Sequence, residues 1–156
     1  MRQIEALKHG RPHRYGDPPQ DDWGVHIEAC ASEMAVAKAY NLYWEPVARR
    51  PENLAGDVGN LQVRSTWREN GRLILHDRDP DDAVFVLVTG RVPSFDVRGW
   101  ILGRDGKVKD HWADGDGRPA YFVPQNALSS GTPPLGRVTV GPWPGSGSST
   151  TGTSSE

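Results

Sequence analysis

The order of hydrophobic and polar positions predicts one helix near the start of the chain. Small and apolar residues run with few interruptions from Asp21 or Asp22 to about Tyr43, a composition that favours helix. Steps of three and four residues give this helix a predicted buried stripe, made of Ile27, Cys30, Met34, Ala37 and Leu42. Asn41 ends the helical pattern, and the proline- and glycine-containing residues 45–60 are expected to form a loop.

Several strands follow the helix. Leu61–Trp67 is a predicted strand, and Asn70-Gly71 predicts a hairpin that joins it to Leu73–His76. Val84–Thr89 is an apolar run typical of a central strand covered on both faces. Phe95–Gly103 predicts a fourth strand, and Tyr121–Val123 is a short apolar piece before a helical turn at residues 125–128. The order predicts an α/β or α+β fold, with the N-terminal helix packed on a central mixed sheet of about four strands.

Composition narrows the class of protein. A chain of 156 residues suits a single domain with a hydrophobic core, and a formal charge of −2 argues against holding nucleic acid by bulk electrostatics. The lone Cys30 has no partner for an internal disulfide, which favours a reducing compartment. The sequence shows neither a signal peptide nor an apolar run long enough to span a bilayer, so we expect a cytoplasmic protein without a membrane partner.

Both ends of the chain differ in composition from its middle. Residues 1–20 are locally basic and are predicted to be a flexible arm, whereas residues 131–156 are rich in Gly, Ser, Thr and Pro and are predicted to be a disordered tail. Within that tail, Arg137–Val140 is the one piece that a sheet could take up as a short strand. The predicted domain is therefore residues 21–130.

Candidate chemistry lies where the loop meets the first strand. Asp57 follows a Gly56 that lets the backbone turn, and alternate side chains of the next strand leave opposite faces. Gln62 and Arg64 should share one face, while Leu61 and Val63 enter the core. A carboxylate, an amide oxygen and a guanidinium are thus predicted to converge, and the upstream helix adds Glu33.

This arrangement resembles the PD-(D/E)XK nuclease superfamily, which has the restriction-endonuclease-like fold, in the small form carried by phages and mobile elements. The resemblance covers Asp21 to Leu128 and rests on the Glu33 helix, the Asp57 turn, the Leu61-Gln62-Val63-Arg64 strand and the two strands that follow. The usual motif is Asp, then an acidic residue, any residue, and Lys. Here Gln62 stands at the second acidic position and Arg64 at the lysine position.

The resemblance implies a divalent-metal-dependent nuclease that hydrolyses phosphodiester bonds in DNA, with Mg²⁺ or Mn²⁺ as cofactor. The implied catalytic residues are Glu33, Asp57, Gln62 and Arg64, and the implied metal ligands are Asp57, Gln62, the Val63 carbonyl and Glu33. Because Arg64 stays protonated, we expect it to bind a phosphate rather than act as a base. Trp67 is a candidate stacking group for a base. Related folds often make paired cuts as dimers, so a homodimer is a further expectation.

Each of these residues also has an alternative interpretation. Glu33 suits a solvated helix face, where it would pair with Lys38, and Asp57 is a common turn residue. Gln62 and Arg64 suit an exposed strand face. At the level of function, the alternative is a catalytically inactive module that binds nucleic acid or protein, or a structural protein without a nucleic-acid role. The acid-rich segment 77–82 resembles a calcium loop but lacks its glycine and final glutamate, so it is predicted to be a turn.

Overall fold

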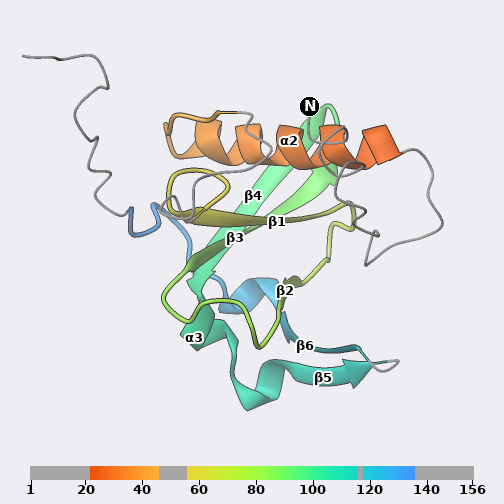
Figure 1. The fold of residues 1–156 in the computed structure, drawn as a ribbon, viewed down its shortest axis with the longest axis vertical. Helices are drawn as coiled ribbons and strands as arrows, with labels where there is room; N and C mark the ends of the chain where they lie inside the picture. Colours follow the sequence, from red (N-terminus) through yellow and green to blue (C-terminus); the bar gives the residue numbers. More distant parts are fainter. Residues whose placement is uncertain (1–21, 46–55, 116–117, 136–156) are drawn as a thin grey trace, which may run out of the picture.

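The computed structural model describes residues 22–45, 56–115 and 118–135, and within these ranges a mixed sheet lies between a helix and a second sheet. Helix α2 (Asp22–Ala39) crosses one face of the first sheet (Figure 1). That sheet has the order β1-β3-β4, formed by β1 (Leu61–Thr66), β3 (Val84–Arg91) and β4 (Ser94–Leu102). Strand β1 runs parallel to β3, and β4 runs antiparallel to β3.

The second sheet lies at the other end of the molecule in Figure 1. It is antiparallel with the order β2-β6-β5, formed by β2 (Leu73–Leu75), β6 (Arg118–Val123) and β5 (Trp112–Gly115). Between β4 and β5 lie the short helix α3 (Gly103–Gly106) and the 3₁₀ turn η1 (Lys109–His111), and η2 (Gln125–Ala127) follows β6. The coarse prediction of an α/β protein with a helix on a mixed sheet is confirmed.

Strand β3 is the centre of the core. Val84, Val86 and Val88 pack on the helix side with Val36 and Ala37 of α2. Phe85 and Leu87 point the other way and, with Ile101 of β4, join a cluster that includes Leu73, Leu75 and Val123 of the second sheet. The prediction that Val84–Thr89 is a central strand covered on both faces is therefore confirmed.

The helix ends with a hydrogen-bonded cap. The Leu42 N–H donates to the Ala37 carbonyl at 2.8 Å and the Asn41 N–H donates to the Lys38 carbonyl at 3.4 Å. Asn41 has a φ of 53°, the left-handed conformation that this type of cap requires. Asn41 thus ends the helical pattern as predicted, although the last helical residue is Ala39 rather than one near Tyr43.

The predicted buried stripe of the helix is confirmed at Ala37 and wrong at Ile27 and Met34. Ile27 and Met34 are 56% and 52% exposed, whereas Ala37 is buried together with Ser32, Glu33 and Val36, which the predicted stripe did not include. Small residues occur all round this helix, so its apolar period is weak. The β-branched Val36 and its neighbour Ala37, which lie against the sheet, decide the orientation.

The predicted hairpin and single sheet are also wrong. Strand β1 pairs with β3, and β2 pairs with β6, so the Asn70-Gly71 turn joins strands of different sheets. The turn itself forms, because the Gly71 N–H donates to the Arg68 carbonyl at 2.9 Å. The Gln125 amide then fastens it to the second sheet by donating to the carbonyls of Glu69 and Gly71. A turn motif in the sequence predicts a local reversal of the chain, but it does not predict which strand the following strand will pair with.

Some predicted features lie outside the described residues. These are the basic arm of residues 1–20 and the tail beyond Leu135, including Arg137–Val140. The described start of the tail is packed, since Pro133 is buried and the Pro134 carbonyl accepts a hydrogen bond from the Asn60 side chain at 3.1 Å. In the ranges that the structure describes, no helix combines the length and apolar character needed to cross a bilayer.

Candidate active site

A tight turn places Asp57 beside the first strand. The Leu61 N–H donates to the Val58 carbonyl at 2.9 Å, and the Asp57 N–H donates to the Leu61 carbonyl at 2.7 Å. Gly59 has a φ of 60°, which glycine adopts without steric cost. A Cβ on Gly56 would lie only 2.6 to 2.8 Å from backbone atoms of residues 59–61. These two glycines let the chain fold back closely on β1.

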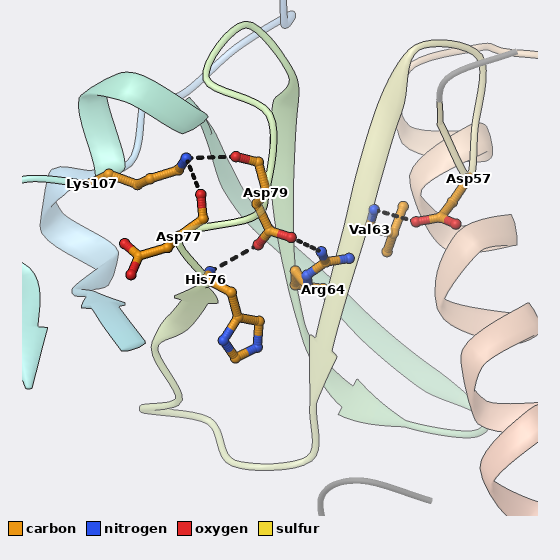
Figure 2. Close-up of polar contacts among 7 residues, drawn as sticks. All are labelled: Asp57, Val63, Arg64, His76, Asp77, Asp79 and Lys107. Carbon is orange, nitrogen blue, oxygen red and sulfur yellow. Dashed lines mark hydrogen bonds and ion pairs between the residues drawn. The ribbon is translucent and has the colours of Figure 1, made fainter. Parts of the chain in front are cut away.

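The carboxylate of Asp57 then binds the edge of that strand. Its Oδ2 accepts a hydrogen bond from the Val63 N–H at 2.8 Å (Figure 2). In an extended strand the N–H and C=O of one residue point to the same side, so the Val63 carbonyl lies on this edge as well. Two of the predicted metal ligands, Asp57 and the Val63 carbonyl, therefore share one edge of β1.

The side chains of β1 leave it in the predicted directions. Leu61 is buried in the cluster beneath α2, and Val63 packs against the same cluster. Gln62 and Arg64, both half-buried, belong to the opposite face by strand alternation. The Arg64 guanidinium lies 5.2 Å from the centroid of the Phe85 ring, on the side of the second sheet.

Arg64 has an acidic partner that the sequence analysis missed. Its Nη2 lies 3.4 Å from Asp79 Oδ1, and Asp79 Oδ2 accepts the His76 N–H at 2.9 Å. Figure 2 shows that Arg64 and Asp57 lie on opposite sides of β1, with Asp57 on the side of α2. The structure thus brings Asp57 to Val63 and brings Arg64 to Asp79, rather than placing the guanidinium beside the Asp57 carboxylate.

The acid-rich loop that holds Asp79 is organised by a lysine. The Lys107 ammonium donates to the carbonyls of Asp77 and Asp79 at 3.2 and 2.5 Å, and to the Asp81 carboxylate at 2.7 Å. Its side chain is only 12% exposed. In addition, the Tyr121 hydroxyl donates to Asp77 at 3.1 Å. The segment that resembles a calcium loop therefore surrounds the protein's own cation, which the sequence places 26 residues beyond Asp81.

Glu33 is a buried residue rather than a solvated one. It is 5% exposed, and its Oε2 accepts a hydrogen bond from the Trp44 indole N–H at 2.9 Å. The alternative that placed Glu33 on a solvated helix face is wrong, because Glu33 lies one turn before Val36 and Ala37 on the face that meets the sheet.

The predicted stacking residue Trp67 follows β1 directly and is 61% exposed. The Arg68 and Arg91 guanidinium carbons lie 5.2 and 5.8 Å from its ring centroid. Neither arginine was predicted to contribute, although parallel pairing of β1 and β3 brings the ends of both strands together. A separate open cavity of about 320 Å³ lies at the outer side of β4, lined by Tyr40, Val97 and Thr132 among others, and contains none of the predicted site residues.

The available oxygen donors decide whether a divalent ion suits the β1 edge. Across residues 22–45, 56–115 and 118–135, no three His, Cys, Asp or Glu side chains lie close enough to hold a metal among themselves. A metal centre built from these residues would use neutral oxygens beside its carboxylates. The Val63 carbonyl and the Gln62 amide are such donors, and an all-oxygen set matches the preference of magnesium and manganese.

Comparison of the chain with protein-family models, with curated proteins and with solved structures found no match.

Proposed function

We propose that the protein is a divalent-metal-dependent nuclease that hydrolyses phosphodiester bonds in DNA. The observation that carries the proposal is the hydrogen bond between Asp57 and the Val63 N–H, because it holds a carboxylate and a strand-edge carbonyl side by side. An ordinary turn aspartate has no need to reach the strand six residues ahead. The restriction-endonuclease-like character of the fold is part of the same proposal.

In this proposal Asp57 and the Val63 carbonyl would hold the ion, joined by Glu33 from α2. Gln62 leaves the opposite face of β1 with Arg64, and it is the predicted ligand that strand alternation turns away from Asp57. A bound Mg²⁺ or Mn²⁺ supplies Lewis-acid stabilisation of the negative charge on the phosphate. The chain's own contribution is to fix the carboxylate before substrate arrives, since the Val63 N–H orients it. Water attacks the phosphorus, and the bond to the leaving sugar oxygen breaks to give a phosphomonoester and a hydroxyl.

Arg64 would bind the phosphate. Its guanidinium stays protonated, lies over Phe85 and is 34% exposed, and the 3.4 Å contact with Asp79 occupies only one of its nitrogens. The contact with Asp79 orients this side chain on the Gln62 face. A phosphate that approaches this face would meet donors that are already ordered, which reduces the entropic cost of binding.

A second candidate function is a nucleic-acid-binding module without catalysis. It is favoured by the hydrogen bonds that Asp57 and Arg64 already make within the protein. Asp57 binds Val63 and Arg64 binds Asp79, on opposite sides of β1. In this case the carboxylate serves the turn and the guanidinium serves the acid-rich loop. The protein would then bind DNA with or without a divalent ion and leave it intact.

The deciding experiment compares cleavage by the wild type, Asp57→Asn and the control Asp110→Asn. Asp110 is an exposed aspartate on η1, outside the proposed site. Single-stranded, duplex and branched DNA are incubated with magnesium, with manganese or with a chelator. We expect metal-dependent cleavage by the wild type and Asp110→Asn, and its loss in Asp57→Asn. Intact DNA under every condition would favour the binding module.

A further inference from the structure

The most unusual surface feature is the group formed by Trp67, Arg68 and Arg91, named here the Trp67 patch. The indole is 61% exposed, although burial of so large an aromatic side chain strongly stabilises a folded protein. Two guanidiniums lie over its ring, at 5.2 Å for Arg68 and 5.8 Å for Arg91. An aromatic ring and two cations are thus presented together to solvent.

The fold explains why these residues meet. Thr66 pairs with Thr89 in the parallel register of β1 and β3, so the residues that follow both strands emerge at one edge of the sheet. Trp67 and Arg68 come from the end of β1, and Arg91 is the last residue of β3. Arg91 is 24 positions from Trp67 and 23 from Arg68 in the sequence, and the pairing of β1 with β3 brings it to them.

The positive charge of the patch is not neutralised by the described chain. Among the residues that the structure describes, neither Arg68 nor Arg91 forms an ion pair with a carboxylate. The carboxylates that approach this edge bind elsewhere. Glu28 accepts the Val92 N–H at 3.1 and 3.3 Å, and Glu69 lies 3.9 Å from Arg98. An anion can therefore bind two guanidinium groups beside an exposed aromatic ring.

From this chemistry we infer that the Trp67 patch binds an unpaired nucleotide of single-stranded DNA. A base can stack on the indole or on a guanidinium plane, and the arginine N–H groups can bind the adjoining phosphates. Duplex DNA buries its bases in the helical stack and offers no free face to the indole. The inference rests on the proposed function for its choice of DNA, and it names the substrate as a strand with unpaired bases.

The position of the patch fits such a strand. Trp67 is three residues beyond Arg64, which corresponds to about 10 Å along an extended chain at about 3.3 Å per residue. The patch and the proposed phosphate contact of Arg64 thus belong to the same strand and its end. The patch would select unpaired DNA while the β1 edge carries out the chemistry.

Binding is measured with the full chain and a chelator present, so that cleavage cannot interfere. The probe is a fluorescently labelled oligothymidylate, compared by anisotropy with a duplex of equal length and with oligouridylate. We expect Trp67→Ala to weaken binding of the oligothymidylate about tenfold. Arg68→Gln combined with Arg91→Gln should lower the slope of log affinity against log salt by about 1.4, at about 0.7 per phosphate contact.

Two control variants test whether the effect belongs to the patch. Trp112→Ala removes a tryptophan that is 40% exposed on β5, and Arg104→Gln removes an exposed arginine on α3. Both should bind like the wild type. Equal affinity of wild type and Trp67→Ala would overturn the inference, as would equal affinity for oligothymidylate and duplex, or tighter binding of oligouridylate. Trp67-dependent binding without metal-dependent cleavage would support the patch and contradict the proposed nuclease activity.

Discussion

Asp57 Oδ2 accepts a hydrogen bond from the Val63 N–H at 2.8 Å across a four-residue turn, and this contact joins the loop before β1 to the edge of that strand. The carboxylate satisfies an N–H that the parallel partner β3 does not reach. Asp57 is consequently a structural acceptor and, in the proposed nuclease, also the acidic metal ligand on this edge. Its two roles are separable, because an amide keeps an acceptor oxygen but loses the charge.

Substitution of Asp57 should separate stability from metal binding. Asp57→Ala leaves the Val63 N–H without its acceptor and should lower the free energy of unfolding by about 1–3 kcal/mol. Asp57→Asn keeps an oxygen acceptor, so we expect a loss below about 1 kcal/mol. Urea unfolding measures both values, and Ser65→Ala, at an exposed position on the same strand, serves as control. Equal losses for Ala and Asn would mean that charge, rather than the hydrogen bond, matters to the turn.

The ammonium of Lys107 should be a main stabilising group of the acid-rich loop. Lys107→Met keeps the length of the side chain but removes all three hydrogen bonds to residues 77, 79 and 81. Because the side chain is 12% exposed and the donor is charged, we expect a loss of about 2–3 kcal/mol in the free energy of unfolding. Lys109→Met, at an exposed position two residues on, should change it little. A Lys107→Met protein as stable as the wild type would show that solvent replaces the ammonium without cost.

Local patterns predicted the parts of the fold that local interactions determine. The apolar run at Val84–Thr89 needs only its composition to indicate a central strand, and Asn41 needs only its tolerance of a positive φ to end a helix. The pairing of β1 with β3 could not be predicted in the same way. The Asn70-Gly71 signal is real, but the choice between a hairpin and a second sheet depends on Leu73 and Leu75 packing against Phe85.

In the candidate site, too, the sequence predicted the features that depend on local interactions and missed those that depend on distant residues. The turn at Gly56-Asp57 and the inward direction of Leu61 and Val63 follow from residue type and strand alternation. The partner of Arg64 does not, because Asp79 lies 15 residues away in a loop whose path is set by Lys107. Burial of Glu33 required knowledge of which helix face meets the sheet. The weak period of the small residues in α2 did not supply it.

The first residues after η2 should matter more to stability than the rest of the tail. Pro133 is buried, and the Pro134 carbonyl accepts a hydrogen bond from the Asn60 side chain, next to the turn that carries Asp57. A chain that ends at Leu135 should therefore melt within a few degrees of the full protein, since the remaining residues are rich in Gly, Ser and Thr. A chain that ends at Ser130 should melt lower. Calorimetry on both truncations tests this, and equal melting temperatures would contradict it.

Two tyrosines should ionise late. Burial raises the pKa of Tyr40, and desolvation, together with the hydrogen bond to Asp77, raises the pKa of Tyr121. Each tyrosine whose folded pKa lies above the unfolded value of about 10 contributes to the free energy of unfolding. That contribution is fully present below pH 10 and is lost as pH rises through the folded pKa. Tyrosinate absorbance should thus show a component above the ordinary range. Tyr40→Phe and Tyr121→Phe should each remove part of it, and ionisation of every native tyrosine near 10 would contradict the prediction.

Glu33 tests whether a buried carboxylate serves structure or chemistry. Glu33→Gln keeps an oxygen that can accept the Trp44 indole N–H at the same place, while it removes the negative charge. If Glu33 contributes charge to a metal centre, Glu33→Gln should fold normally yet lose most metal-dependent cleavage and bind manganese more weakly by calorimetric titration. Glu33→Ala removes the acceptor as well, and should lower the free energy of unfolding by about 1–3 kcal/mol. Lys38→Met, at an exposed position on the same helix, controls for changes to α2 itself. Full cleavage by Glu33→Gln would restrict Glu33 to holding Trp44 and leave Asp57 as the acidic ligand of the site.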